Sequence, residues 1–105
     1  MKHKTSKITK LEKNRFSILT DKLEECYICH RSPVDINEIF MGRNRLNSMK
    51  YGLCIPLCRF CHNKYHNDRT MQLYFMNLAY NVFIKLYSVE EFKDTFKYIK
   101  GLDIF

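Results

Sequence analysis

Two Cys-x-x-Cys pairs constrain this chain more than any other feature of its sequence. The first pair is Cys26 and Cys29, and the second is Cys58 and Cys61. A knuckle with this spacing directs both thiolates toward one ion, and two knuckles supply the four soft ligands of a tetrahedral zinc site. The sequence therefore predicts a structural zinc ion held by these four cysteines.

Other interpretations of the cysteines stay open. The second pair could bind zinc together with His62 or His66, and either pair could act as a redox dithiol. Residues 30–57 separate the two pairs, which is more than in a compact zinc ribbon. That length is enough for a strand, a loop and a returning strand between the knuckles.

The N-terminal sequence predicts no secretory signal, because its basic start is followed only by a short apolar run at 16–19. We therefore expect the chain to stay in the cytoplasm. Thiols are kept reduced there, so paired cysteines favour a metal over structural disulfides. The fifth cysteine, Cys54, has no sequence partner, which agrees with a reducing compartment.

Size and charge narrow the class of protein. A chain of 105 residues suits one domain, and its 46% hydrophobic content predicts a modest core that a metal would help to stabilise. The formal net charge of +7 favours nucleic acid as a partner, through phosphate contacts. A basic soluble protein without such a partner is the plainer alternative.

Local patterns predict an α+β fold in three parts. We expect a basic N-terminal arm over 1–20, a zinc-bound module over 21–69 and a helical extension over 70–105 that packs on the module. The expected strands cover 34–41 and 53–57, with a polar loop over 42–52 between them. The expected helices cover 62–66, 71–87 and 89–99.

The predicted helix over 71–87 is strongly apolar except for a narrow stripe of Asn77, Asn81 and Lys85. These polar residues, and its short length, argue against a membrane span. The apolar excess could be buried in a homodimer or covered by the last helix. Ser88 and Glu91 form the expected capping box at the start of that last helix.

The sequence between Cys26 and His66 resembles HNH endonucleases with a zinc-bound treble clef, and is especially similar to a phage-associated subset. The order is Cys-x-x-Cys, a strand, an arginine-containing loop, Tyr-Gly-Leu-x-x-Pro-Leu and Cys-x-x-Cys-His-x-x-x-His. Three further segments carry the resemblance: Asn37-Glu38-Ile39-Phe40, Lys50-Tyr51-Gly52-Leu53 and the stretch from Glu90 to Phe96. The resemblance would place a phage-encoded chain in a bacterial host cell.

The resemblance implies a ββα-metal hairpin and helix that hold one catalytic divalent cation, such as Mg, Mn or Ni. The last two histidines of the family match His62 and His66. Its first metal ligand falls at Asn37 and its general base at Glu38, and both residues depart from the family pattern. The family's central asparagine is replaced by Leu53, so that Asn44 or Asn47 would have to substitute for it.

These departures lead to two hypotheses. In the first, the chain is a metal-dependent endonuclease in which Glu38 activates water or joins His62 and His66 as a metal ligand. In the second, it is a degenerate HNH fold that binds DNA or a protein partner without cutting, and an unrelated zinc adaptor is a third possibility. The residues expected to hold the DNA backbone are Arg43, Arg45, Lys50 and Lys64.

Overall fold

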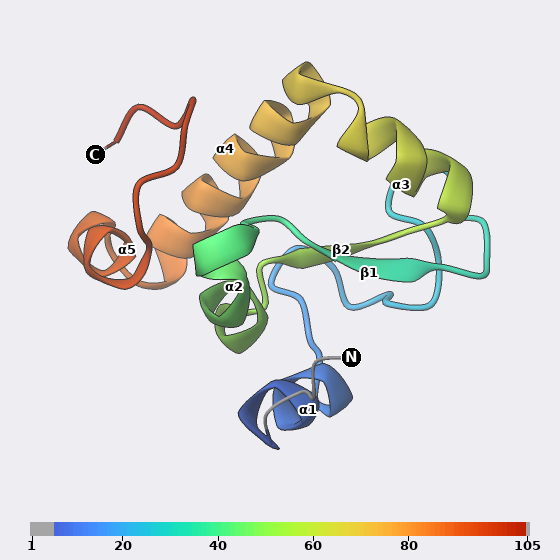
Figure 1. Cartoon of the computed structure of the whole chain (residues 1–105), viewed down its shortest axis with the longest axis horizontal. Helices are drawn as coiled ribbons and strands as arrows, with labels where there is room; N and C mark the ends of the chain where they lie inside the picture. Colours follow the sequence, from blue (N-terminus) through green and yellow to red (C-terminus); the bar gives the residue numbers. More distant parts are fainter. Residues whose placement is uncertain (1–5, 105) are drawn as a thin grey trace.

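A two-stranded antiparallel hairpin lies at the centre of the fold, and helices cover both of its faces (Figure 1). The structure, a computed structural model, describes residues 6–104 and is α+β, as the sequence predicts. Its elements are α1 (Ser6–Lys13), β1 (Asp35–Glu38), the 3-10 helix η1 (Gly42–Asn44), α2 (Arg45–Tyr51), β2 (Cys54–Leu57), α3 (Arg59–His66), α4 (Arg69–Leu86) and α5 (Val89–Thr95).

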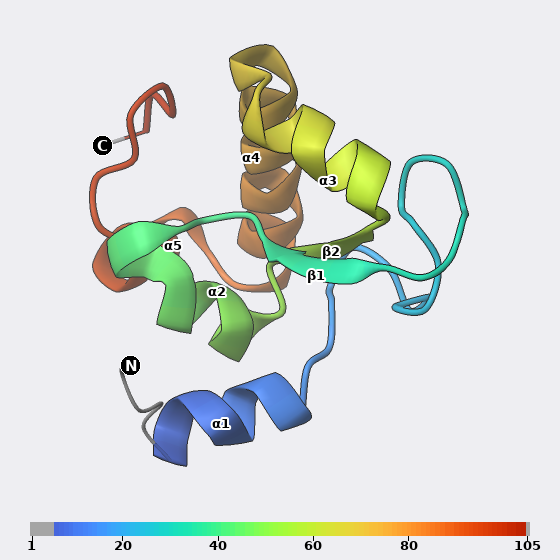
Figure 2. The ribbon, with the colours of Figure 1, turned by 45° about the vertical axis from the view of Figure 1, so that its right-hand side comes forward.

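The hairpin separates the helices into two groups. Helices α3 and α4 lie on one side of it, and α1 and α2 lie on the other (Figure 2). Residue Asp35 pairs with Leu57, and Glu38 pairs with Cys54. Because successive side chains of a strand point to opposite faces, Asp35 and Asn37 face α3, whereas Glu38 faces α1 and α2.

The segment over 42–52, expected to be a polar loop, is instead helical, and that prediction was wrong. Its many polar residues gave no indication of a buried side, yet Ser48 and Met49 are both buried. The Ser48 hydroxyl accepts from Phe40 N at 3.2 Å and donates to Phe40 O at 2.7 Å, so α2 is tied to the end of β1. Gly52 ends the helix with a left-handed φ of 72°.

Other predicted boundaries shift by a few residues. Strand β1 covers less of the expected 34–41 because the chain leaves the hairpin after Glu38 to enter η1. Helix α3 begins earlier than residue 62, since Cys58 caps it. The last helix ends at Thr95 rather than near residue 99. Part of the predicted N-terminal arm forms α1, while residues 1–5 lie outside the described part of the chain.

The end of α5 and the residues after it are held by two asparagines, one just before α2 and one within its first turn. The Asn44 side chain accepts from Lys97 N at 2.8 Å and donates to Lys97 O at 3.3 Å. The Asn47 amide donates to Thr95 O at 3.0 Å. The Asn47 bond satisfies a carbonyl that α5 leaves free at its C-terminus, and the Asn44 bonds hold the chain just beyond that helix.

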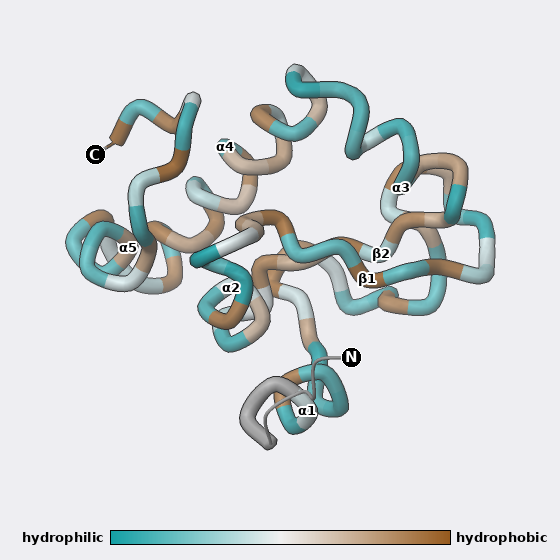
Figure 3. The backbone as a smooth tube through the Cα atoms, viewed as in Figure 1, coloured by the Kyte–Doolittle hydropathy of each residue, from teal (hydrophilic) through white to brown (hydrophobic). Residues whose placement is uncertain are grey.

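Helix α4 packs against α2 and α5 in the core. Its Phe83 ring contacts Tyr51 of α2, with centroids 5.3 Å apart, and Phe92 of α5, at the same distance. The predicted serine cap of α5 is confirmed, because the Ser88 hydroxyl accepts from Glu91 N at 3.0 Å. Apolar residues run along α4, while its connection to α3 is hydrophilic (Figure 3).

The apolar residues of α4 are largely covered within the chain. Phe75, Met76 and Phe83 are buried, and Leu86 near the C-terminal end is 59% exposed. A homodimer through this helix therefore stays a prediction, with less apolar surface to bury than the sequence indicates. No helix within residues 6–104 is both long and apolar enough to cross a membrane.

Candidate metal centre and histidine pair

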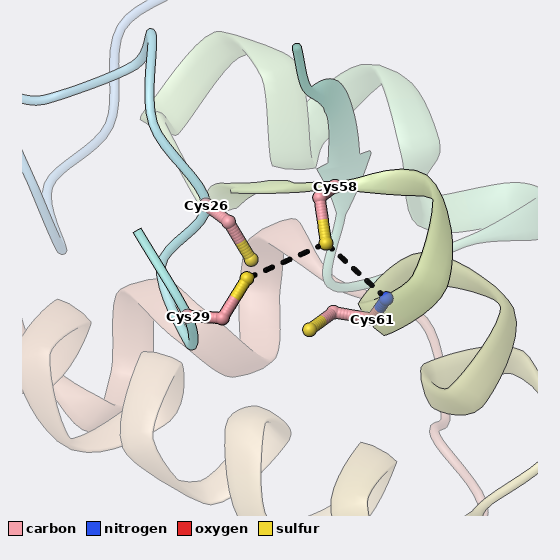
Figure 4. A group of neighbouring side chains, drawn as sticks. All are labelled: Cys26, Cys29, Cys58 and Cys61. Carbon is pink, nitrogen blue, oxygen red and sulfur yellow. Dashed lines mark hydrogen bonds between the residues drawn. The ribbon is translucent and has the colours of Figure 1, made fainter. Parts of the chain in front are cut away.

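Four thiols from two distant parts of the chain meet at one point (Figure 4). The sulfur atoms of Cys26, Cys29, Cys58 and Cys61 all lie within 4.8 Å of one another, and none is in a disulfide. Zinc–sulfur bonds of about 2.3 Å place the corners of a tetrahedron ~3.8 Å apart. We call this group the four-cysteine cluster; its donors and spacing fit a metal ion such as zinc.

Backbone hydrogen bonds shape the first knuckle. Cys26 N donates to Arg31 O, and His30 N donates to Cys26 O, each at 2.9 Å. His30 adopts a φ of 67°, the left-handed conformation that lets the chain turn back so tightly. The bond from Tyr27 N to Pro56 O, at 2.8 Å, fastens the knuckle to β2 and so to the second cysteine pair.

The second knuckle is the first turn of α3. Cys58 is extended, with φ −65° and ψ 164°, and its sulfur accepts from Cys61 N at 3.5 Å as a helix cap. The sulfur atoms of Cys29 and Cys58 are also 3.5 Å apart (Figure 4). One helical turn thus presents two thiols to the knuckle opposite.

The surroundings of the thiols affect their ionisation unequally. Burial opposes ionisation of Cys26, but hydrogen bonds from the backbone at Cys29, Cys58 and Ile28 lower the pKa of its thiol to about 6. Burial, and then hydrogen bonds with the other thiols, raise the pKa of Cys61 to about 12. Four thiolates in so small a space would repel one another unless a cation offset their charge.

Cys54 takes no part in the cluster. Its sulfur donates to Phe16 O at 3.2 Å, and burial, followed by the nearby Glu38 carboxylate, raises the pKa of the thiol to about 11. It is a packed, unreactive residue on the α1 side of the hairpin. In the sequence Cys54 lies outside both Cys-x-x-Cys pairs, which agrees with this position.

His62 and His66 lie one turn apart on α3, and their imidazoles face each other. Their Nε2 atoms are 2.9 Å apart, and Nδ1 of His62 lies 3.1 Å from a carboxylate oxygen of Asp35. A carboxylate on the remote ring nitrogen is the usual support of a metal-binding histidine, because it fixes the ring and its tautomer. The separation also fits a direct hydrogen bond between two neutral imidazoles.

Asp35 was not singled out in the sequence. It precedes Asn37 by two residues, which puts both side chains on the face of β1 that meets α3. That spacing was the only available signal, and the extent of β1 was needed to use it. Its carboxylate also pairs with Arg59, with an N to O distance of 3.3 Å.

Asn37 reaches this face but is almost fully buried, at 3% exposure. Its amide nitrogen and the Tyr65 hydroxyl make no hydrogen bond of regular geometry within the described residues, although the two side chains are neighbours. Burial raises the pKa of the Tyr65 phenol, an effect that the neighbouring Asn37 side chain partly opposes. Among the histidines, cysteines and acidic residues of 6–104, three or more potential ligands converge only at the four-cysteine cluster, so Glu38 does not form a second such group with His62 and His66.

Glu38 is not brought to the histidine pair. One carboxylate oxygen accepts a hydrogen bond from Arg15, and the other lies 3.7 Å from Nε of Arg45. The expected orientation toward His62 and His66 is corrected by the alternation of β1, which directs Glu38 to the opposite face. Arg15, whose partner is 23 residues away, could not be identified from sequence.

Of the other predicted site residues, some are engaged elsewhere in the fold and some are exposed. Asn44 and Asn47 bind the C-terminal segment and do not join the histidine pair. Arg45 is engaged with Glu38 and, at 3.8 Å, with Glu12. The exposed residues available for phosphate contacts are Arg43, Lys50 and Lys64.

Comparison of the chain with protein families, with curated proteins and with solved structures finds no match.

We expect removal of metal to unfold the protein, because the free energy of metal binding to such a cluster is also free energy of folding. Excess chelator should abolish the helical circular dichroism signal cooperatively, and Cys58→Ser should act similarly. Cys54→Ser is the matched control, since Cys54 lies outside the cluster. A metal-free protein that keeps its fold would contradict this prediction.

We expect Arg15→Ala to destabilise the fold by about 2 kcal/mol, because the mostly buried Glu38 carboxylate loses its closer partner. Arg43→Ala, at an exposed arginine, should change stability by less than about 0.5 kcal/mol. Urea unfolding of the metal-loaded protein measures both values. Arg15→Met combined with Glu38→Leu should recover most of the loss; equal stability of Arg15→Ala and the wild type would contradict the role of the ion pair.

Proposed function

We propose that this protein is an HNH-like endonuclease with a zinc-stabilised treble clef, which cleaves DNA phosphodiester bonds with the help of a divalent cation. The observation that carries the proposal is the arrangement of His62 and His66. Their Nε2 atoms are 2.9 Å apart beside the four-cysteine cluster, and Asp35 supports His62 from behind. The resemblance of the motifs between Cys26 and His66 to those of HNH endonucleases also supports the proposal.

The chemistry of the histidine pair suits a cation site. His62 is half-buried and held by Asp35, whereas His66 is exposed, so one ligand is fixed and the site stays open to solvent. Two protein ligands leave positions for water and a phosphate oxygen. A cation bound there would neutralise charge on the phosphate and favour ionisation of water.

The chain's own residues would bind and orient the DNA. Exposed Arg43, Lys50 and Lys64 would contact phosphates. We assign no chemical step to Glu38, because two arginines engage its carboxylate on the other face of β1. We therefore assign the chemistry to the histidine pair with Asp35 as the positioning residue of His62.

A non-cutting DNA-binding protein is the second candidate. The position of Glu38 favours it, because a base on this strand would have to face α3, where Asn37 is a buried amide and the Asp35 carboxylate is engaged with His62 and Arg59. An amide is not a proton acceptor of useful strength. The two candidates share the zinc-stabilised fold and differ in whether the histidine pair takes a cation and supports cleavage.

We expect His66→Ala to lower the cleavage rate at least a hundredfold through loss of the cation. Plasmid nicking in Mg, Mn or Ni is the measurement, and Asn63→Ala, at an exposed residue of the same helix, is the matched control. Glu38→Gln should leave the rate per folded molecule unchanged. Wild-type protein that cleaves with none of these ions would favour the second candidate.

DNA binding should be mainly electrostatic, since it depends on side chains that contact phosphates. The logarithm of affinity should fall linearly with the logarithm of salt concentration, and each of Arg43→Ala, Lys50→Ala and Lys64→Ala should reduce that slope by about one. Arg15→Lys is the control, because Arg15 is engaged with Glu38. An affinity that does not depend on salt would argue against nucleic acid as the partner.

A further inference from the structure

A pocket with a volume of about 260 Å³ lies beside the histidine pair. Its walls come from the chain after β1, the end of α3, the start of α4 and the segment after α5. Tyr65 lines it, and the adjoining His66 ring is 5.9 Å from the Tyr65 ring, centroid to centroid. Gln72, another lining residue, donates to the backbone oxygens of Tyr65 and His66. The pocket and the histidine pair therefore share one wall.

The lining combines apolar and cationic groups. Ile39, Met41, Met76 and Ile99 form apolar walls, and Tyr98, which is 73% exposed, offers an aromatic face. Such walls suit a flat apolar ring. The volume of about 260 Å³ is just below the roughly 300–1,000 Å³ of most small-molecule sites, so it suits a single ring system rather than a longer chain.

The charged residues that line the pocket are all cationic. Arg69 and Lys100 line it, and its lining contains no carboxylate. Arg69 donates to the oxygens of Gln72 and Lys100, which are neutral acceptors, so its charge is held in place without being cancelled. Two cations at the edge of an apolar pocket favour an anionic group on the ligand.

We propose that this pocket binds one nucleoside monophosphate unit, with the base against Tyr98 and the apolar walls and the phosphate near Arg69 and Lys100. The choice of a nucleotide among aromatic anions rests on the proposed function of the adjacent histidine pair. In a nucleic acid the unit would be an unpaired nucleotide next to the bond to be cut. A free mononucleotide would present the same chemistry.

Titration calorimetry of the full, zinc-loaded chain tests the proposal with three probes. Deoxyadenosine monophosphate should bind at least tenfold more tightly than deoxyribose 5-phosphate or inorganic phosphate, because only the first carries a base. Met41→Trp, which fills the pocket from an exposed position, and Lys100→Glu should each weaken that binding at least fivefold. Their controls are Leu86→Trp and Lys93→Glu, which are exposed and outside the pocket, and both should bind as the wild type does.

A single-stranded oligonucleotide distinguishes the source of the ligand. If Met41→Trp weakens both the mononucleotide and the oligonucleotide, the pocket takes a nucleotide within a strand; if it weakens the mononucleotide alone, the pocket takes free nucleotides. Equal affinity for all three probes would overturn the proposal, even if the protein cleaves DNA. Conversely, tight mononucleotide binding by a wild-type protein that cleaves DNA with none of Mg, Mn and Ni would support the pocket and refute the proposed function.

Discussion

The meeting of four thiols at one point determines how the rest of the chain is arranged. The first knuckle has little regular structure of its own, and its contacts with β2 and α3 place it. Because Cys58 and Cys61 are the first turn of α3, the ion that such thiols bind would also fix the direction of that helix. The direction of α3 in turn decides where His62, His66 and Tyr65 point. A metal bound in a structural role would thus control the geometry of a separate, candidate functional surface.

The alternation of side chains between the two faces of β1 has an equally large effect on the candidate site. Asp35 and Asn37 face α3, while Glu38, the next residue, meets Arg15 and Arg45 on the other side. A carboxylate enclosed by two guanidinium groups joins α1 and α2 to the hairpin and is not free for chemistry at the histidine pair. The resemblance to HNH endonucleases aligned Glu38 with the general base of that family. An alignment of sequences, however, does not determine which face of a strand a side chain occupies.

The sequence was sufficient wherever the signal was local. The spacing of the cysteines predicts the cluster, and Ser88 with Glu91 predicts the start of α5. It failed where long-range contacts decided the outcome. Residues 42–52 read as a loop because the partners that bury Ser48 and Met49 lie elsewhere in the chain. The roles of Asn44 and Asn47 depend on carbonyls about fifty residues away, at Thr95 and Lys97, and no local pattern reports such contacts.

The distribution of charge sets the last constraint on function. The formal net charge of +7 counts every arginine equally, yet Arg15 and Arg45 are occupied by buried carboxylates and contribute little to attraction at the surface. The cations that remain available include Arg43, Lys50 and Lys64, together with Arg69 and Lys100 at the pocket. Since the last two line the pocket beside the histidine pair, they would attract a phosphate to the place where the pair and an apolar pocket adjoin. A polyanion held there would bring a phosphate and its neighbouring base to two adjacent sites at once.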